Sequence, residues 1–145
     1  MIRITKEFKF EMAHALHGYD GLCKNIHGYS YRLWVQIKGQ TRNISGDTKD
    51  GMVIDFSDLK KIVKENVVLK YDHSLVLNAN SPHSKIDLSA FEKVYYLPFQ
   101  PTSENLVAYF SEIIQEKLPK HIQLVKLILS ETATSYAEWN IEDFI

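Results

Sequence analysis

The sequence predicts an α+β fold in which two helices pack on one face of a four-stranded antiparallel sheet. Two period-two stretches begin the chain, two helical stretches occupy its middle, and two strand-rich stretches joined by a short turn end it. With 145 residues and 45% hydrophobic content, the chain has the size of a single domain, residues 1–145. Four strands are few for a closed barrel, so we expect any barrel to be closed by several copies.

The first two strands are predicted from alternation. Over residues 2–12 all the apolar side chains fall on even positions, whereas the odd positions hold only charged residues and threonine. Over residues 29–37 the apolar side chains fall on odd positions, with Trp34 as the exception. This alternation is typical of half-buried strands. Residues 14–28 contain three glycines and no period, which predicts a loop long enough to suggest a function.

The middle of the chain is predicted to hold two helices. Ser57 is placed to cap the first, whose apolar face fades near Lys70. Residues 79–100 contain prolines and no sustained period, so we expect a long connection or insertion there rather than an element. Residues 101–104 open the second helix, and Pro119 ends it.

The last two strands form a predicted hairpin, and one of them carries an unusual carboxylate. Residues 122–131 and 135–141 are rich in strand-forming residues and are joined by a turn at 132–134. Glu131 lies on the apolar side of its strand, where a carboxylate is costly unless something pairs with it. Two interpretations stay open: a structural pair with a lysine or arginine, or an anchor that accepts two parallel hydrogen bonds from a guanidine-like edge, as in guanine or a pterin.

Three side chains are predicted to meet at the loop end of the first hairpin. His14 continues the inward parity of the first strand, and His27 and Tyr29 continue that of the second. Three convergent ligands with an open fourth position are what a catalytic zinc site needs. The alternative is that each histidine is an ordinary polar residue at a strand end.

A cysteine and an Asp-His pair are the other candidates for chemistry. Cys23 stands four residues before His27, and a thiol near a cation becomes a usable base or nucleophile. Asp72 and His73 are adjacent just beyond a helix end, where a carboxylate can orient an imidazole and raise its basicity. The alternatives are a small buried apolar residue for the cysteine and a chance neighbourhood for the pair.

Composition argues against several classes of protein. The net charge is −1 with charges dispersed along the chain, so no basic stripe for nucleic acid is expected. The single cysteine excludes an internal disulfide and suits a reducing compartment. The N-terminus alternates charged and apolar residues, unlike a signal peptide or a membrane span. We therefore expect a cytoplasmic protein that does not bind membranes.

Six short segments occur in order along the chain. They are F-x-F-x-M-A-H (8–14), C-x-x-x-H-G (23–28), D-G-M-V-I-D-F (50–56), Y-D-H (71–73), P-T-S-E-N (101–105) and E-T-A-T-S-Y-A (131–137). Together they resemble the 6-pyruvoyl-tetrahydropterin synthase and 6-carboxytetrahydropterin synthase family, over nearly the whole chain. The resemblance implies the tunnelling fold, in which subunits of ββ-α-α-ββ order oligomerise into a ring-shaped barrel, commonly a trimer stacked into a hexamer.

The resemblance also implies a role for each candidate residue. His14 and His27 would ligate one zinc ion per subunit. Cys23 would be the base that moves protons on the substrate side chain, and Asp72 with His73 would be its acid–base partner. In addition, Glu131 would grip the pterin ring, with Thr102 nearby.

Two functions follow from the resemblance. The first is a zinc-dependent lyase that converts 7,8-dihydroneopterin triphosphate to 6-carboxy-5,6,7,8-tetrahydropterin, a step toward queuosine and other deazapurines, with 6-pyruvoyl-tetrahydropterin synthase as a close variant. The second is a metal-poor, catalytically inactive relative that binds pterins or guanine-like rings without turnover.

One position departs from the family pattern. The family motif ends histidine-glycine-histidine, whereas this chain has His27, Gly28 and Tyr29, so the third expected zinc ligand is a tyrosine. A phenol must lose a proton with a pKa of about 10 before it binds metal well, so the affinity for zinc should drop. Three arrangements stay open: Tyr29 ligates as a phenolate, His17 from the loop takes its place, or the site holds no metal.

Overall fold

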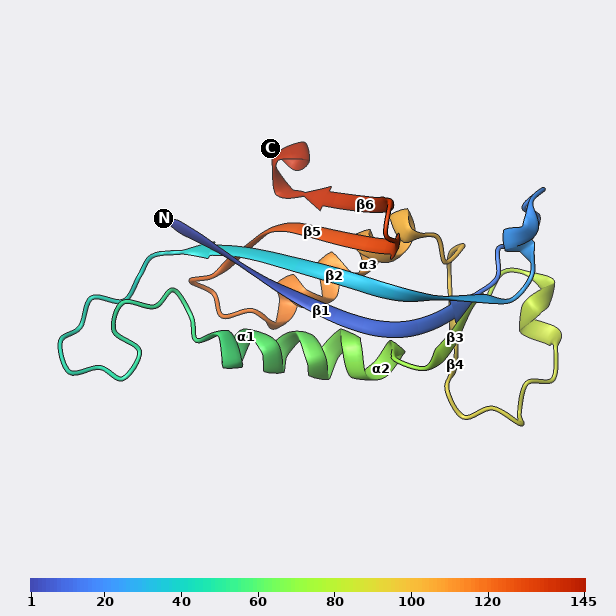
Figure 1. Cartoon of the computed structure of the whole chain (residues 1–145), viewed down its shortest axis with the longest axis horizontal. Coiled ribbons are helices and arrows are strands. Elements are labelled where there is room, and N and C mark those ends of the chain that lie inside the picture. The colour runs from blue at the N-terminus through green and yellow to red at the C-terminus, as the bar shows by residue number, and fades with distance from the viewer.

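The chain folds into one sheet and two long helical segments (Figure 1). The computed structural model describes all of its residues, Met1–Ile145. The strands are β1 (Ile2–His14), β2 (His27–Gly39), β3 (Ser74–Asn78), β4 (Val94–Leu97), β5 (Gln123–Thr132) and β6 (Ser135–Asn140). The α-helices are α1 (Phe56–Val63), α2 (Leu69–Tyr71) and α3 (Ser103–Lys117). A π-helical segment, Lys64–Val68, joins α1 to α2, so residues 56–71 form one continuous helix. None of the helices is both long and apolar enough to cross a bilayer.

The strands form a single mixed sheet in the order β4-β3-β1-β2-β5-β6. The α+β class and the four predicted strands are confirmed, but the sheet has six strands rather than four. The pairs β1–β3 and β3–β4 are parallel, so the sheet is not purely antiparallel. The prediction of no element in residues 79–100 is wrong, because this segment contains β4 and a 3-10 turn, Pro82–Lys85. A four-residue strand spans too few alternations to give a period, and its pairing with β3 is what defines it.

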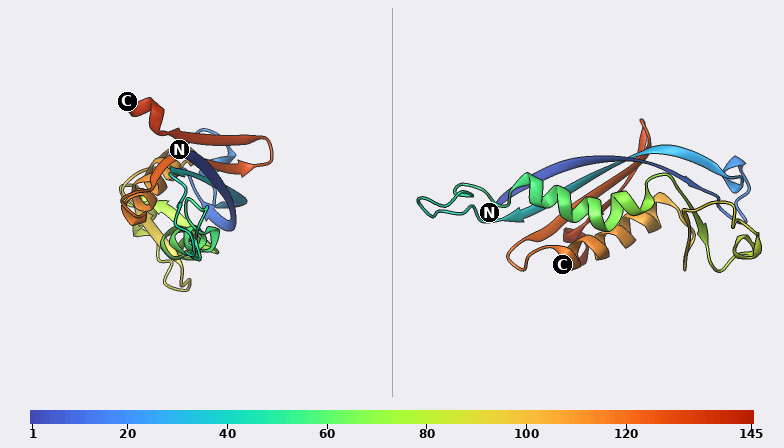
Figure 2. Two further views of the ribbon diagram at one scale, coloured as in Figure 1. Left: turned by 90° about the vertical axis from the view of Figure 1, so that its left-hand side faces the viewer. Right: turned by 90° about the horizontal axis from the view of Figure 1, so that it is seen from below.

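Both long helical segments cover the same face of the sheet (Figure 2). The alternation of the first hairpin is confirmed: Phe10 on β1 and Tyr31 on β2 are buried, whereas Lys9 and Arg32, one position away, are exposed. The Phe10 and Tyr31 rings stack at 5.4 Å, and Phe110 of α3 packs edge-on against Phe10 at 6.4 Å. The core therefore lies between this face and the helices.

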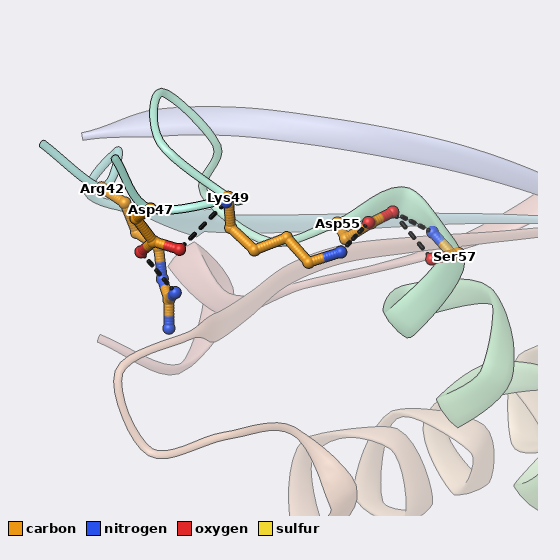
Figure 3. A network of polar contacts seen from close by, with 5 residues as sticks. All are labelled: Arg42, Asp47, Lys49, Asp55 and Ser57. Carbon is orange, nitrogen blue, oxygen red and sulfur yellow. Dashed lines mark hydrogen bonds and ion pairs between the residues drawn. The ribbon is translucent and has the colours of Figure 1, made fainter. Parts of the chain in front are cut away.

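The long segment 40–55 projects from one end of the sheet and is tied to α1 by a polar network (Figures 1 and 3). The helix cap is Asp55 and not Ser57, because the Asp55 carboxylate accepts hydrogen bonds from the Ser57 amide and hydroxyl, both at 2.8 Å. The Lys49 ammonium also pairs with Asp55. The Lys49 amide and Arg42 bind the two oxygens of Asp47 at 3.0 and 2.9 Å.

Replacing Asp55 with alanine is expected to lower the melting temperature by a few degrees at neutral pH, since it removes the helix cap and the partner of Lys49. The hydrogen bonds from Lys49 and Ser57 hold the pKa of Asp55 well below its usual range. The stabilisation is therefore complete above the unfolded-state pKa of about 3.9 and is lost as the pH falls through the lower folded-state pKa. The difference between the melting temperatures of wild type and variant should therefore begin to shrink as the pH falls below about 4. Asp20→Ala, at an exposed loop position, is the control, and a gap between the melting temperatures that is independent of pH would contradict this account.

Candidate active site

Two histidines meet at the loop end of the first hairpin, where His14 of β1 lies directly opposite His27 of β2. His14 is only 1% exposed and His27 is half-buried. Their ring centroids lie 4.5 Å apart, and the two Nε2 atoms approach to 2.9 Å. The parity of the two strands therefore brings these side chains together as expected.

The backbone orients both rings. The Nδ1 atom of His14 lies 2.6 Å from the Pro101 carbonyl oxygen, and that of His27 lies 2.7 Å from the Asn25 carbonyl oxygen. A carbonyl only accepts hydrogen bonds, so each Nδ1 donates to its carbonyl, and the two Nε2 atoms are left to point at each other. Burial lowers the pKa of His14, so a proton shared between the two Nε2 atoms is disfavoured. Histidines held in this way through Nδ1 are typical metal ligands, and the two Nε2 atoms are close enough to share one cation.

Tyr29 packs against both imidazoles but differs from them chemically. Its ring centroid lies 5.1 Å from that of His27 and 5.8 Å from that of His14. Burial raises the pKa of Tyr29, and the hydrogen bond with Cys23 and the charge of Glu131 raise it further. The phenol is therefore neutral at physiological pH unless a cation displaces its proton.

No other side chain completes a metal-binding set of three. The chain contains no group of three or more histidine, cysteine, aspartate or glutamate side chains arranged to hold a metal ion. His17 does not join the His14–His27 pair: its ring lies against His83, with the ring centroids 5.2 Å apart. The structure therefore offers Tyr29, and not His17, beside the two imidazoles.

Cys23 lies in the loop that covers this end of the hairpin. It belongs to a 3-10 turn, Leu22–Lys24, and is half-buried rather than part of the core. Its Sγ atom lies 4.0 Å from the Tyr29 hydroxyl oxygen. The Leu16 amide donates to the Cys23 carbonyl at 2.9 Å, which folds the loop back onto the end of β1. The thiol therefore stands beside Tyr29, whose ring packs against the imidazoles.

Glu131 approaches the His14–His27 pair from β5. Its Oε1 atom lies 3.9 Å from His14 Nε2, and no lysine or arginine lies within 4.0 Å of its carboxylate. The structure thus contains no lysine or arginine pair for this residue. Thr102 follows Pro101, whose carbonyl binds His14, and its hydroxyl caps α3 by accepting from the Asn105 amide at 3.2 Å.

Tyr31 is a site residue that the sequence did not single out. Its hydroxyl is fully buried and has no hydrogen-bond partner within the chain. Burial, and then the nearby charge of Glu131, raise the pKa of Tyr31 above its ordinary value. Its position on the inward parity of β2 suggested a core residue, and only the buried hydroxyl beside a carboxylate indicates a polar role.

Asp72 and His73 form a pair that is held by the end of β1. The Asp72 carboxylate accepts from the Glu11 amide at 2.9 Å and lies 3.1 Å from His73 Nδ1. The His73 side chain is 76% exposed and borders a hollow of about 770 Å³ together with Glu11 and Ser30, residues of the sheet face opposite the core. No hydrogen bond joins either residue to Cys23 within one chain.

A sequence model of the 6-pyruvoyl tetrahydropterin synthase family matches residues 3–142. The chain belongs to this family. The 6-carboxy-5,6,7,8-tetrahydropterin synthase of Haemophilus influenzae is 34% identical over 143 residues, which cover 96% of this chain and 99% of that protein. The protein of the same description from Rickettsia bellii is 30% identical over 142 residues, covering 95% and 99%. The resemblance carried by the six segments is therefore confirmed, and the family is one of tetrahydropterin synthases of the lyase type.

Solved structures share the fold of this family member. The 6-pyruvoyl tetrahydropterin synthase of Plasmodium falciparum aligns with a TM-score of 0.71 and 23% identity, over 95% of this chain and 96% of that one. The Caenorhabditis elegans 6-pyruvoyl tetrahydropterin synthase aligns with a TM-score of 0.68 and 24% identity, over 96% and 94%. At these identities the likeness concerns the arrangement of strands and helices.

Proposed function

We propose that this chain is a zinc-dependent carbon–carbon lyase that converts 7,8-dihydroneopterin triphosphate and water to 6-carboxy-5,6,7,8-tetrahydropterin, acetaldehyde and triphosphate. The observation that carries the proposal is the His14–His27 pair, whose Nε2 atoms approach to 2.9 Å beside Cys23 and Glu131. Relatives that bear the name of this activity, at 34% and 30% identity over nearly the full chain, favour the carboxy product. Such a product suits the route to queuosine and other deazapurines.

The residues around the His14–His27 pair fit one zinc ion per subunit. His14 and His27 would hold it through Nε2, with Tyr29 as a third ligand once its phenol has lost the proton. Bound there, zinc would supply Lewis acidity that makes the neighbouring C–H of the substrate side chain easier to deprotonate.

The chain's own groups would bind the pterin and move the proton. The Glu131 carboxylate has no cationic partner from lysine or arginine, so it is free to accept two parallel hydrogen bonds from the N–H edge of the pterin. This would direct the substrate side chain toward Cys23, whose thiolate would accept the proton at Sγ. The Tyr29 hydroxyl, 4.0 Å from that sulfur, would donate a weak hydrogen bond to the thiolate.

We infer that the working form is a homo-oligomer, a trimer or a hexamer. Apart from Met12–His14, where β3 pairs, β1 has β2 as its only neighbour, and β6 pairs with β5 alone. Free edges of this kind are normally covered, and copies joined edge to edge would close a barrel. Because Asp72 and His73 form no hydrogen bond with Cys23 of their own chain, we expect a neighbouring copy to supply the pair that exchanges protons with the thiol.

The proposal is tested by measuring the zinc content of the purified protein together with triphosphate and acetaldehyde released from 7,8-dihydroneopterin triphosphate. Stoichiometric zinc and both products in equal amounts are expected, with Cys23→Ala as the blank. A pyruvoyl product without acetaldehyde would assign the chain to the close variant, 6-pyruvoyl-tetrahydropterin synthase. Absence of zinc and of both products would overturn the proposed lyase activity.

A second function, binding of a pterin without turnover, is favoured by one observation. The environment of Tyr29 raises its pKa, which opposes the phenolate that a third zinc ligand requires. Pterin binding in a wild-type protein that holds no zinc and releases no product, with activity appearing in Tyr29→His, would support this second function.

A further inference from the structure

The peptide between Asp72 and His73 is held at both of its polar groups. Its N–H, which belongs to His73, donates to the Glu11 carbonyl at 2.6 Å. Its C=O, which belongs to Asp72, accepts from the ammonium of Lys93. Since these two groups lie in one rigid plane, the two contacts together fix the rotation of that plane.

This constraint matters because His73 has an unusual backbone. It is the only non-glycine residue of the chain with a positive φ, at 60°. Such a conformation is costly for a residue with a Cβ and persists only where the surroundings impose it. The direction of the His73 side chain into the hollow therefore depends on the contacts that hold the preceding peptide.

Lys93 is well placed to impose the conformation. It comes directly before β4, and its own carbonyl accepts from the Leu75 amide at 2.9 Å, so its backbone is anchored to β3. The ammonium also donates to the Leu69 carbonyl at 2.8 Å, and no carboxylate lies within 4.0 Å of it. Its charge is thus directed at the carbonyl end of the helix formed by residues 56–71, where a cation is favourable.

The same charge acts on the carboxylate of the pair. Partial burial works to raise the pKa of Asp72, but the hydrogen bond from the Glu11 amide and the charges of His73 and Lys93 outweigh it. The pKa of Asp72 therefore lies below its ordinary value, and the carboxylate is available to orient the His73 ring.

We propose that Lys93 is a positioning residue for the Asp72–His73 pair. The segment between β3 and β4 then contributes to the chemistry, because it contains Lys93. The role rests on the proposed function of that pair in proton transfer. Lys93 does not reach the reacting atoms. It holds the peptide from which both side chains emerge, so that the imidazole faces the hollow of about 770 Å³ that Lys93 itself helps to line.

Three variants test the proposal in the full-length, zinc-loaded protein. Lys93→Met keeps the aliphatic stem and removes the charge and the donors, whereas Lys93→Arg retains both. Lys85→Met is the matched control, because Lys85 is an exposed lysine of the same segment with no hydrogen bond or ion pair. The measurements are kcat, KM, and the rate of hydrogen exchange at the His73 amide.

The expected result is a selective loss. Lys93→Met should lower kcat by about tenfold to a hundredfold through misorientation of the pair, with little change in KM because Glu131 still binds the pterin. Exchange at the His73 amide should be about tenfold faster, since the peptide is released on one side. Lys93→Arg should restore most of kcat, and Lys85→Met should match wild type.

Two results would overturn the role of Lys93: wild-type kcat in Lys93→Met, or an equal loss in Lys93→Arg accompanied by loss of folded protein. Failure of the proposed function is a separate outcome, because the wild type itself would then release no product. In that case hydrogen exchange at the His73 amide decides whether Lys93 holds the peptide between Asp72 and His73. Unchanged exchange in Lys93→Met overturns this role, and faster exchange with an unaffected Lys85→Met supports it.

Discussion

Replacing Glu131 with glutamine is expected to weaken pterin binding by about a hundredfold, because two charge-assisted hydrogen bonds are lost. A carboxylate offers two equivalent acceptors to the parallel N–H groups of a pterin edge. The amide of glutamine is nearly the same size but presents one acceptor and one donor, and its NH₂ opposes a ligand N–H. In the unbound protein the Glu131 carboxylate has no lysine or arginine partner, so pterin binding does not have to break an ion pair of that kind.

This effect is measured by titrating a fluorescent pterin into wild type and Glu131→Gln, each with and without zinc. Both states are needed because Glu131 Oε1 lies 3.9 Å from His14 Nε2, so that the substitution also removes negative charge near a bound cation. Glu138→Gln is the matched control: it removes a carboxylate from β6 whose contacts are with Lys126 at 3.8 Å and with the Asn140 amide at 3.4 Å, away from His14. Equal affinities of wild type and Glu131→Gln in the zinc-free state would remove Glu131 from the role of anchor.

The convergence of the first hairpin was predictable from the sequence because it follows from local rules. Alternation assigns a face to each residue of a strand, and antiparallel pairing brings the faces of two strands into register. Those two rules are enough to bring His14, His27 and Tyr29 to one end of the sheet. The same reasoning gives Glu131 its inward side on β5, where the structure has it facing His14.

Features that depend on remote contacts were not predictable. The orientation of the two Nε2 atoms toward each other requires the carbonyls of Asn25 and Pro101, and the latter lies 87 positions from His14 in the sequence. The strand β4 exists through its pairing with β3, and Asp55 rather than Ser57 caps α1 because of how the preceding loop folds. Similarly, the adjacency of Asp72 and His73 in sequence says nothing of their place relative to Cys23, which follows from the course of the chain after α2.

Replacing Tyr29 with histidine is expected to strengthen zinc binding by up to about a thousandfold at pH 7. An ordinary phenol with a pKa of about 10 must give up a proton at a cost of about 4 kcal/mol at this pH before it ligates, whereas a neutral imidazole pays almost nothing. Burial, Cys23 and Glu131 raise the pKa of Tyr29, which adds to the cost in the natural chain. The new ring would join two imidazoles whose Nε2 atoms already face each other at 2.9 Å.

The pH dependence of zinc affinity distinguishes the roles open to Tyr29. Ligation by a phenolate releases one proton, so the affinity should rise about tenfold per pH unit throughout the range below the raised pKa of Tyr29. In Tyr29→His the rise should flatten above about pH 7, because histidine is already neutral there. Tyr29→Phe is the control that keeps the ring and removes the ligand. If its affinity matches wild type from pH 7 to pH 9, Tyr29 does not bind the metal, and zinc in the natural chain rests on His14 and His27 alone.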